Sequence, residues 1–252
     1  MGLLPEDIQE RVRQSKKVCV FTGAGVSAES GVPTFRDAGG LWENHRPEDL
    51  VTASAFSRDP VPVWRWHAWL QGVCHSAEPN AAHKVIADLD RHYPEFLVIT
   101  QNIDTLHERG GTKRMVKLHG DIMETRCLKK GHVVTLDRPF DKESITSLET
   151  LPKCPRCGEP CRPNVVWFGE LLPEKPLLTG REFAASCDLF LIVGTSGVVS
   201  GGYGFTELAR YGGALVLEVN PQESALTHLA HFSLRLPAAQ AMPGIWSTGV
   251  ME

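Results

Sequence analysis

The chain has no long apolar segment. None of its hydrophobic runs approaches the roughly 18 residues that a membrane-spanning helix needs. The N-terminus also lacks the apolar core of a secretory signal peptide, and it lacks the Ser or Thr of a myristoylation signal. The seven cysteines are scattered instead of forming the framework of a disulfide-stapled domain, which favours a reducing compartment. We therefore expect a cytoplasmic protein without a membrane partner.

The chain also has little excess of charge of either sign. The 26 Lys and Arg residues nearly balance the 30 Asp and Glu residues, which leaves a formal net charge of −4. So small an imbalance gives no strong field for polyanions, so nucleic acid is not expected as the main partner. Internal repeats and low-complexity segments are also absent. With 42% hydrophobic residues over 252 positions, the chain can bury the core of one large domain with a smaller insertion.

What the sequence does contain is a series of short apolar runs separated by stretches of helical character. This alternation predicts an α/β fold: a doubly wound, Rossmann-type parallel sheet with a smaller domain inserted. The expected strands are residues 18–21, 96–99, 115–118, 189–193 and 214–219. We assign residues 1–30, 94–120 and 171–252 to the Rossmann domain, and residues 31–93 and 121–170 to a small, partly helical domain.

The first apolar run, residues 18–21, leads directly into a glycine-rich turn. Gly23 and Gly25 lack a Cβ, so the backbone there can turn tightly and approach a phosphate group closely. A helix that begins near Ser27 would direct free N–H groups toward a dinucleotide pyrophosphate. A Gly-x-Gly turn is also a common plain turn, so this segment alone leaves both interpretations open.

Further segments narrow the interpretation. They are Thr34-Phe35-Arg36, Gln101-Asn102-Ile103-Asp104 after the strand at 96–99, Leu118-His119-Gly120 after the third strand, and residues 165–170. Taken together, in this order, they resemble the sirtuin family, the NAD-dependent protein deacylases, from about residue 18 to the C-terminal strand. The details are similar to compact bacterial members of class III. The resemblance implies an enzyme that uses NAD and acts on acyl-lysine proteins or peptides.

The same resemblance implies which residues bind NAD. Ser27 would face the pyrophosphate, Phe35 and Arg36 would close over the nicotinamide ribose, and the segment from Gln101 would line the nicotinamide pocket. The segment Gly194-Thr195-Ser196 and the residue Asn220 each follow an apolar strand, at the carboxyl ends where doubly wound sheets bind ligands. The full expected set is Gly23, Ala24, Gly25, Ser27, Phe35, Arg36, Gln101, Asn102, Ile103, Asp104, Gly194, Thr195, Ser196, Asn220 and Ala238.

His119 and Asn102 are the expected catalytic residues. An imidazole with an ordinary pKa of about 6.5 suits proton transfer at neutral pH. The family mechanism implies that His119 deprotonates a ribose hydroxyl of NAD, and that the products are free lysine, nicotinamide and O-acyl-ADP-ribose. A mono-ADP-ribosyltransferase and a non-catalytic NAD-sensing module are the alternatives. The intact His119 and Asn102 and the peptide-binding segments disfavour both.

The substrate peptide is expected to add as a strand between two extended segments, residues 165–170 and 197–199. The residues implied to contact it are Val166, Trp167, Phe168, Gly169 and Val198. Nearby the chain departs from the family, because Ser200-Gly201-Gly202-Tyr203 replaces the usual Tyr-Pro-Ala run. The two glycines predict a looser loop.

Cys154 and Cys157 are spaced as a zinc knuckle, which predicts a tetrahedral zinc site and makes the small domain a zinc ribbon. The partner pair is incomplete, because Lys130 stands where the second sulfur of its Cys-x-x-Cys is expected. Cys127 and His132 would complete a Cys₃His site, with Cys161 as another candidate for the fourth ligand. A site too degenerate to hold metal is the remaining alternative. Four protein ligands would make the zinc structural.

The acyl pocket is the last expectation. Ala38-Gly39-Gly40 leaves room for a bulky acyl group, but the class III Tyr-x-x-Arg pair that reads an acidic chain aligns with His67 and Leu70. The arginine is therefore missing, and Trp66, Trp69 and Leu70 make the region apolar, either as pocket wall or as plain core. We expect acetyl or neutral longer acyl chains to be preferred over succinyl and malonyl. A desuccinylase with a non-standard carboxylate contact, from Arg65 or His67, is the alternative, and the oligomeric state stays open.

Overall fold

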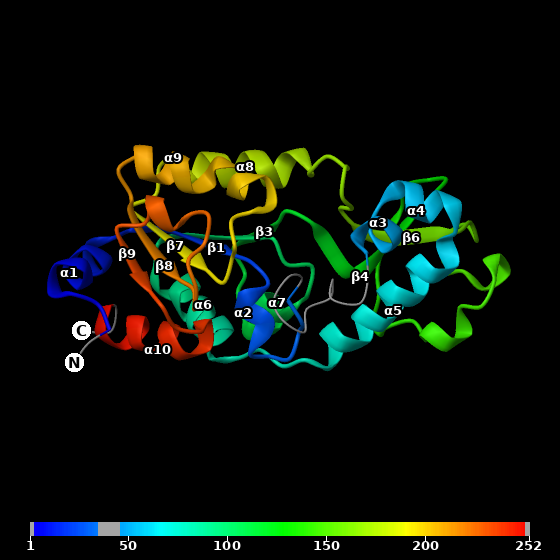
Figure 1. The fold of residues 1–252 in the computed structure, drawn as a ribbon, viewed down its shortest axis with the longest axis horizontal. Coiled ribbons are helices and arrows are strands. Elements are labelled where there is room, and N and C mark those ends of the chain that lie inside the picture. The colour runs from blue at the N-terminus through cyan, green and yellow to red at the C-terminus, as the bar shows by residue number, and fades with distance from the viewer. Residues whose placement is uncertain (1–2, 35–45, 250–252) are drawn as a thin grey trace.

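The computed structural model describes residues 3–34 and 46–249. Figure 1 shows an elongated molecule with a large sheet domain at one end and a smaller module at the other. The sheet has six parallel strands in the order β3-β2-β1-β7-β8-β9. They are β1 (Lys17–Thr22), β2 (Glu95–Thr100), β3 (Met115–Lys117), β7 (Leu189–Val193), β8 (Leu215–Val219) and β9 (Phe232–Leu234). The α/β fold with a Rossmann-type sheet is thereby confirmed.

Successive residues of each central strand contribute to two different cores. In β1, Val18 and Val20 pack on one face, while Cys19 and Phe21 pack on the other. All four side chains are fully buried. A strand covered on both faces has no polar side, which explains why the strands read as unbroken apolar runs.

Helices cover both faces of the sheet (Figure 1). The core of one face includes buried residues of α1 (Glu6–Gln14), α6 (Ala81–His92) and α10 (Ala238–Gly249). The core of the other includes residues of α8 (Glu174–Ala184) and α9 (Phe205–Tyr211). In the described part of the chain, no helix is both long and apolar enough to cross a membrane.

The smaller module combines a three-stranded antiparallel sheet with helices. Its strands are β4 (Gly120–Cys127), β5 (Val133–Thr135) and β6 (Cys161–Val165), in the order β5-β4-β6. Its helices are α3 (Pro47–Leu50), α4 (Ala53–Arg58) and α5 (Pro60–Ser76), with short 3₁₀ turns at Lys142–Ser144 and Leu148–Thr150. Trp64 of α5 is fully buried, and its Nε1 donates to the Cys161 carbonyl at 2.9 Å, which fixes α5 on β6.

Two features of the Rossmann domain differ from the sequence-based expectation. Helix α6 lies within the range assigned to the small domain, yet Ile86 and Leu89 pack in the core of the large sheet. The boundary therefore lies before α6, because its amphipathic face is buried against β2 and α10. The short strand β9 was not expected, since three residues of mixed polarity carry too weak an alternation.

Candidate active site and metal centre

Two glycine turns meet where the strand order reverses, between β1 and β7. The Gly25 N–H donates to the Gly194 carbonyl at 2.8 Å. A Cβ on Gly25 would lie 2.8 Å from the Gly194 Cα, and one on Gly194 would lie 2.3 Å from the Val26 nitrogen. Helix α2 (Gly25–Ala28) begins in the first turn. The topological switch point of a doubly wound sheet is where dinucleotides bind, so this backbone fits a pyrophosphate.

Beside these turns lies a small cavity lined by polar groups of two strand ends. Ser27 Oγ donates to Asp104 Oδ2 at 2.9 Å and accepts from Asn102 Nδ2 at 3.1 Å. All three side chains are buried. Side-chain amide, hydroxyl and carboxylate together offer the donors and acceptors that a carboxamide ligand needs. The cavity is lined by Ala24, Ser27, Val32, Pro33, Leu70, Cys74, Asn102, Ile103 and Asp104.

A buried histidine of α6, missed by the sequence reasoning, supports this cavity from behind. The Asn80 N–H donates to His83 Nδ1 at 3.3 Å, so the ring proton lies on Nε2, which faces Ser27 Oγ at 3.4 Å. Burial lowers the pKa of His83 to about 4, so the ring is neutral. The reciprocal capping of α6 by Asn80 and His83 was the signal that could have found it.

On the other side of the switch point, Gln101, Thr195 and Asn220 form a second linked group. Thr195 Oγ1 donates to Gln101 Oε1 at 2.6 Å, and Asn220 Nδ2 donates to the Thr195 carbonyl at 3.0 Å. Asn220 also donates to Glu218, whose side chain is fully buried. Burial raises the pKa of Glu218, but hydrogen bonds from neighbouring side chains and Arg235 outweigh it and hold the pKa below the usual range. Gln101, Thr195 and Asn220 each follow a strand of the large sheet, so this group lies at the carboxyl edge of the sheet.

The remaining expected cofactor residues lie close by or outside the described residues. Ser196 accepts a hydrogen bond from the Ala225 N–H at 2.9 Å through its carbonyl. Ala238 is buried at the start of α10, and the next residue, Ala239, donates its N–H to Glu29 beyond α2 at 2.6 Å. Phe35 and Arg36, and the small residues Ala38-Gly39-Gly40, lie outside the described residues.

His119 follows β3 and reaches toward the same strand ends. Its Nδ1 lies 2.7 Å from the Gln101 carbonyl oxygen, and its Nε2 lies 2.7 Å from the Tyr203 hydroxyl. A carbonyl only accepts, so Nδ1 carries the proton and Nε2 is the basic nitrogen. Burial lowers the pKa of His119, and the hydrogen bond to Gln101 opposes this shift only in part. The imidazole is therefore neutral at pH 7, which is the state that a general base requires.

The expected peptide segment after β6 is tied to His119. The Val166 N–H donates to the His119 carbonyl at 2.8 Å, and Phe168 is 48% exposed while its N–H donates to the Val51 carbonyl. Gly169 follows with a positive φ of 84°. The indole of Trp167 is instead buried in the module core, with the Arg162 guanidinium 3.6 Å above it. Its side chain is therefore core and not a substrate contact.

Val198 also differs from expectation, because its backbone is helical (φ −75°, ψ −31°) and not extended. The Thr195 hydroxyl accepts from the Gly197 N–H at 3.3 Å, and Gly197 has a positive φ of 66°. Such side-chain-to-backbone bonds favour a turn over a strand. The Val198 side chain is nevertheless 54% exposed beside the site.

His67 and Leu70, the expected acyl-pocket pair, have different roles. His67 is fully buried; its Nδ1 lies 2.8 Å from the Val63 carbonyl, and its Nε2 accepts from Trp167 Nε1 at 3.2 Å. Burial lowers the pKa of His67 to about 4. Both nitrogens are thus used internally, so His67 has no donor for an acyl carboxylate. Leu70 does line the cavity, whereas Trp66 and Trp69 line a separate groove with Arg65.

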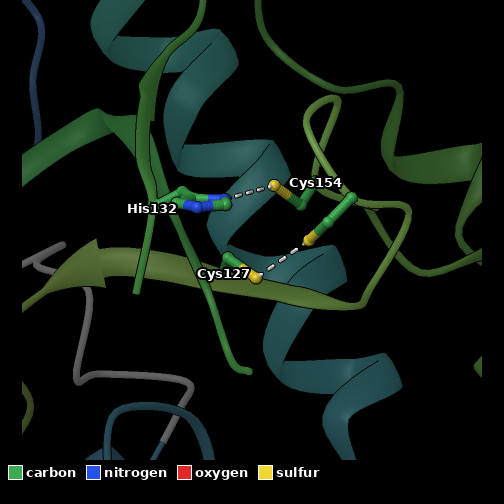
Figure 2. A group of neighbouring side chains, drawn as sticks. Cys127, His132 and Cys154 are labelled. Atoms are coloured by element: carbon green, nitrogen blue, oxygen red, sulfur yellow. Dashed lines mark hydrogen bonds between the residues drawn. The ribbon is translucent and has the colours of Figure 1, made fainter. Parts of the chain in front are cut away.

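A metal-binding cluster lies in the small module (Figure 2). The ligand atoms of Cys127, His132, Cys154 and Cys157 all lie within 4.8 Å of one another. A tight turn between Cys127 and His132, closed by the Cys127 N–H on the His132 carbonyl at 2.8 Å, brings Nδ1 to 3.6 Å from Cys154 Sγ. Cys161 is buried nearby but does not belong to this group of four, which favours His132 as the fourth ligand. Three sulfurs and one imidazole fit tetrahedral zinc.

Comparisons with known proteins agree with this architecture. Residues 23–201 match the model of the Sir2 family. The chain is 44% identical to an "NAD-dependent protein deacylase 2" from Pyrobaculum aerophilum over 94% of this chain and 92% of the relative. A structure described as a Sir2 homolog–NAD complex superposes with a TM-score of 0.89 at 38% identity, covering 97% and 94% of the two chains. A Sir2–p53 peptide–NAD⁺ structure does so at 0.82 and 27%, covering 97% and 98%. With a family match over most of its length and such relatives across nearly all of it, the chain belongs to the Sir2, or sirtuin, family.

Proposed function

We propose that the protein is an NAD-dependent protein-lysine deacylase that releases nicotinamide and O-acyl-ADP-ribose. The observation that supports this most is the position of His119: neutral, with Nε2 as its basic nitrogen, bonded to Gln101 and to the segment that begins at Val166. His119 thereby contacts the proposed NAD edge of the sheet through its imidazole and the proposed peptide edge of the module through its backbone carbonyl. The curated relatives are named for the same general activity.

The residues at the switch point are proposed to hold NAD, which when bound supplies a ribose carbon that can accept an oxygen nucleophile as nicotinamide departs. The Gly25 and Gly194 turns contact each other through their backbone, and we propose that the pyrophosphate binds beside them. Asn102 and Asp104, held by Ser27, would orient the nicotinamide carboxamide and its ribose. His119 Nε2 would accept a proton from a ribose hydroxyl, while the Gln101 carbonyl holds the Nδ1 proton in place.

Product masses test this function against a mono-ADP-ribosyltransferase. We expect incubation with NAD and one acetyl-lysine peptide to give the deacylated peptide, nicotinamide and a product with the mass of acetyl-ADP-ribose. A transferase would instead give an ADP-ribosylated protein or peptide with the acetyl group retained. No turnover of NAD with any acyl-peptide, by protein that binds NAD, would contradict both.

We further propose that acetyl and neutral longer chains are better substrates than acidic ones. The expected acyl-pocket residue Leu70, which lines the small cavity, is apolar, and burying each methylene of an acyl chain against it would contribute roughly 0.8 kcal/mol. No cation lies among the described residues that line this cavity, so a succinyl carboxylate would leave water there without a partner, which is costly. Arg65 does not supply one, because its guanidinium pairs with Glu143 at 3.4 Å beside a different groove.

A panel of one peptide carrying acetyl, butyryl, decanoyl, succinyl or malonyl lysine measures this preference. We expect kcat/KM for acetyl to exceed that for succinyl at least about tenfold, since an uncompensated carboxylate costs more than 1.4 kcal/mol. In Leu70→Arg the ratio should move toward succinyl. Leu178→Arg, a change at an exposed leucine of α8, is the matched control and should leave the ratio unchanged. A wild-type preference for succinyl would contradict the proposal.

A further inference from the structure

Tyr203 has an unusual backbone. Its φ is +59°, and among residues 3–34 and 46–249 it is the only non-glycine residue with a positive φ. Gly202 and Gly204 on either side are also left-handed, at 66° and 73°. A residue with a Cβ is unfavourable in this region, and such residues cluster at functional sites. The expected loose loop is thus a short 3₁₀ turn, Val199–Gly204, with one strained residue in it.

The contacts of Tyr203 are what hold it there. Its hydroxyl lies 2.7 Å from His119 Nε2, with the two rings edge-to-face at 5.9 Å. Its ring also meets Phe205 at 6.2 Å, and the Arg181 guanidinium of α8 donates to its carbonyl at 3.2 Å. The charged groups that flank His119 in sequence, Lys117 and Asp121, pair with each other at 2.7 Å. The Tyr203 phenol is therefore the group that bonds to Nε2, the unprotonated nitrogen of His119.

This hydrogen bond competes with the proposed reaction. Because His119 Nδ1 donates to Gln101, the neutral ring has one lone pair, at Nε2, and the phenol donates into it. One lone pair in the ring plane accepts one good hydrogen bond. A substrate hydroxyl cannot reach Nε2 while the phenol occupies it.

We propose that Tyr203 is a positioning residue that covers the basic nitrogen of His119 in the free enzyme and is displaced when NAD and the acyl-peptide bind. The inference rests on the proposed function of His119. The left-handed backbone favours departure, because leaving relieves an unfavourable conformation, and the flanking glycines permit the movement without steric cost. Binding of the substrates thus uncovers the base only in the complex that needs it.

The first test measures the nitrogen directly and does not require activity. Diethyl pyrocarbonate acylates neutral imidazole nitrogens, and mass spectrometry of the His119 peptide gives its rate. Without substrates, Tyr203→Phe should raise this rate about fivefold, the factor that corresponds to one hydrogen bond of ordinary net strength. Exposed His228 is the internal reference, and Tyr211→Phe, at a residue that is 85% exposed, is the matched control. An unchanged His119 rate would overturn the proposal.

The second test separates displacement from a proton relay through the phenol. Displacement predicts that Tyr203→Phe lowers KM for the acyl-peptide, with kcat kept, and so raises kcat/KM up to about fivefold. A fall in kcat of tenfold or more would mean that the phenol carries the proton, and it would overturn the proposal. If His119→Ala remains active while Tyr203→Phe still speeds acylation of His119, the assigned base is wrong but the covering contact stands.

Discussion

Replacement of His119 by Ala is expected to lower kcat/KM for deacylation at least about a hundredfold, the usual scale for loss of a general base. The basic Nε2 has no replacement in Ala, and the hydroxyl of Tyr203 has a far weaker proton affinity. NAD affinity should change little, because Ser27 holds Asn102 and Asp104, Glu218 holds Asn220, and Gln101 meets the imidazole only through its backbone carbonyl. Single-turnover product formation and NAD titration measure the two effects separately.

The matched control for this variant is His228→Ala, at an exposed histidine. It should leave turnover and NAD affinity unchanged. The pH profile gives a second check. Since burial lowers the pKa of His119, the acid limb of the rate should lie below the ordinary histidine pKa, with the rate falling as the pH drops through that lowered value. Near-normal turnover in His119→Ala would remove this residue from the mechanism.

Loss of the metal is expected to destabilise the small module severely. Structural zinc sites contribute on the order of 10 kcal/mol to folding, which is comparable to the whole stability of a typical domain. His132→Ala and Cys154→Ser should therefore lose zinc and lower the melting temperature and solubility. NAD affinity of the protein that remains folded should change much less, because the cluster is built on the small three-stranded sheet and not at the switch point of the large one.

Cys161→Ala is the matched control, because Cys161 is a buried cysteine of the same module that lies outside the cluster. It should retain one zinc per chain by elemental analysis and lose only about 1 kcal/mol of stability. If Cys161→Ala loses zinc and His132→Ala keeps it, the fourth ligand is Cys161. Purified wild-type protein without zinc would refute the metal site itself.

The sequence predicts a part of the molecule correctly when a local pattern of residues also determines what that part contacts in the fold. The central strands are continuous apolar runs because helices cover both of their faces. The Cys127–His132 spacing predicts a metal site because the turn that it specifies is local. Helix α6 was misplaced because its amphipathic pattern shows that one face is buried but not which sheet it is buried against.

The side chains around the acyl cavity could not be assigned in this way. From the sequence alone, His67 is a polar residue that could bind a ligand. In the structure its two nitrogens bond to Val63 and to Trp167, which lies 100 positions away in the chain. Tyr203 is similar, since its partner His119 is 84 positions distant. A hydrogen bond between distant segments leaves no periodic signal, so polar residues of this kind are assigned only when the packing is known.

The bond from the Val166 N–H to the His119 carbonyl joins the proposed peptide-binding segment to the proposed base. A peptide that adds beside residues 166–168 would therefore contact the same main chain that positions the His119 imidazole. Residues flanking the acyl-lysine, which never touch the reacting atoms, therefore acquire influence over turnover. Sequence preference in this enzyme should emerge as differences in kcat among peptides of similar affinity, so affinity screens alone would misjudge its substrates.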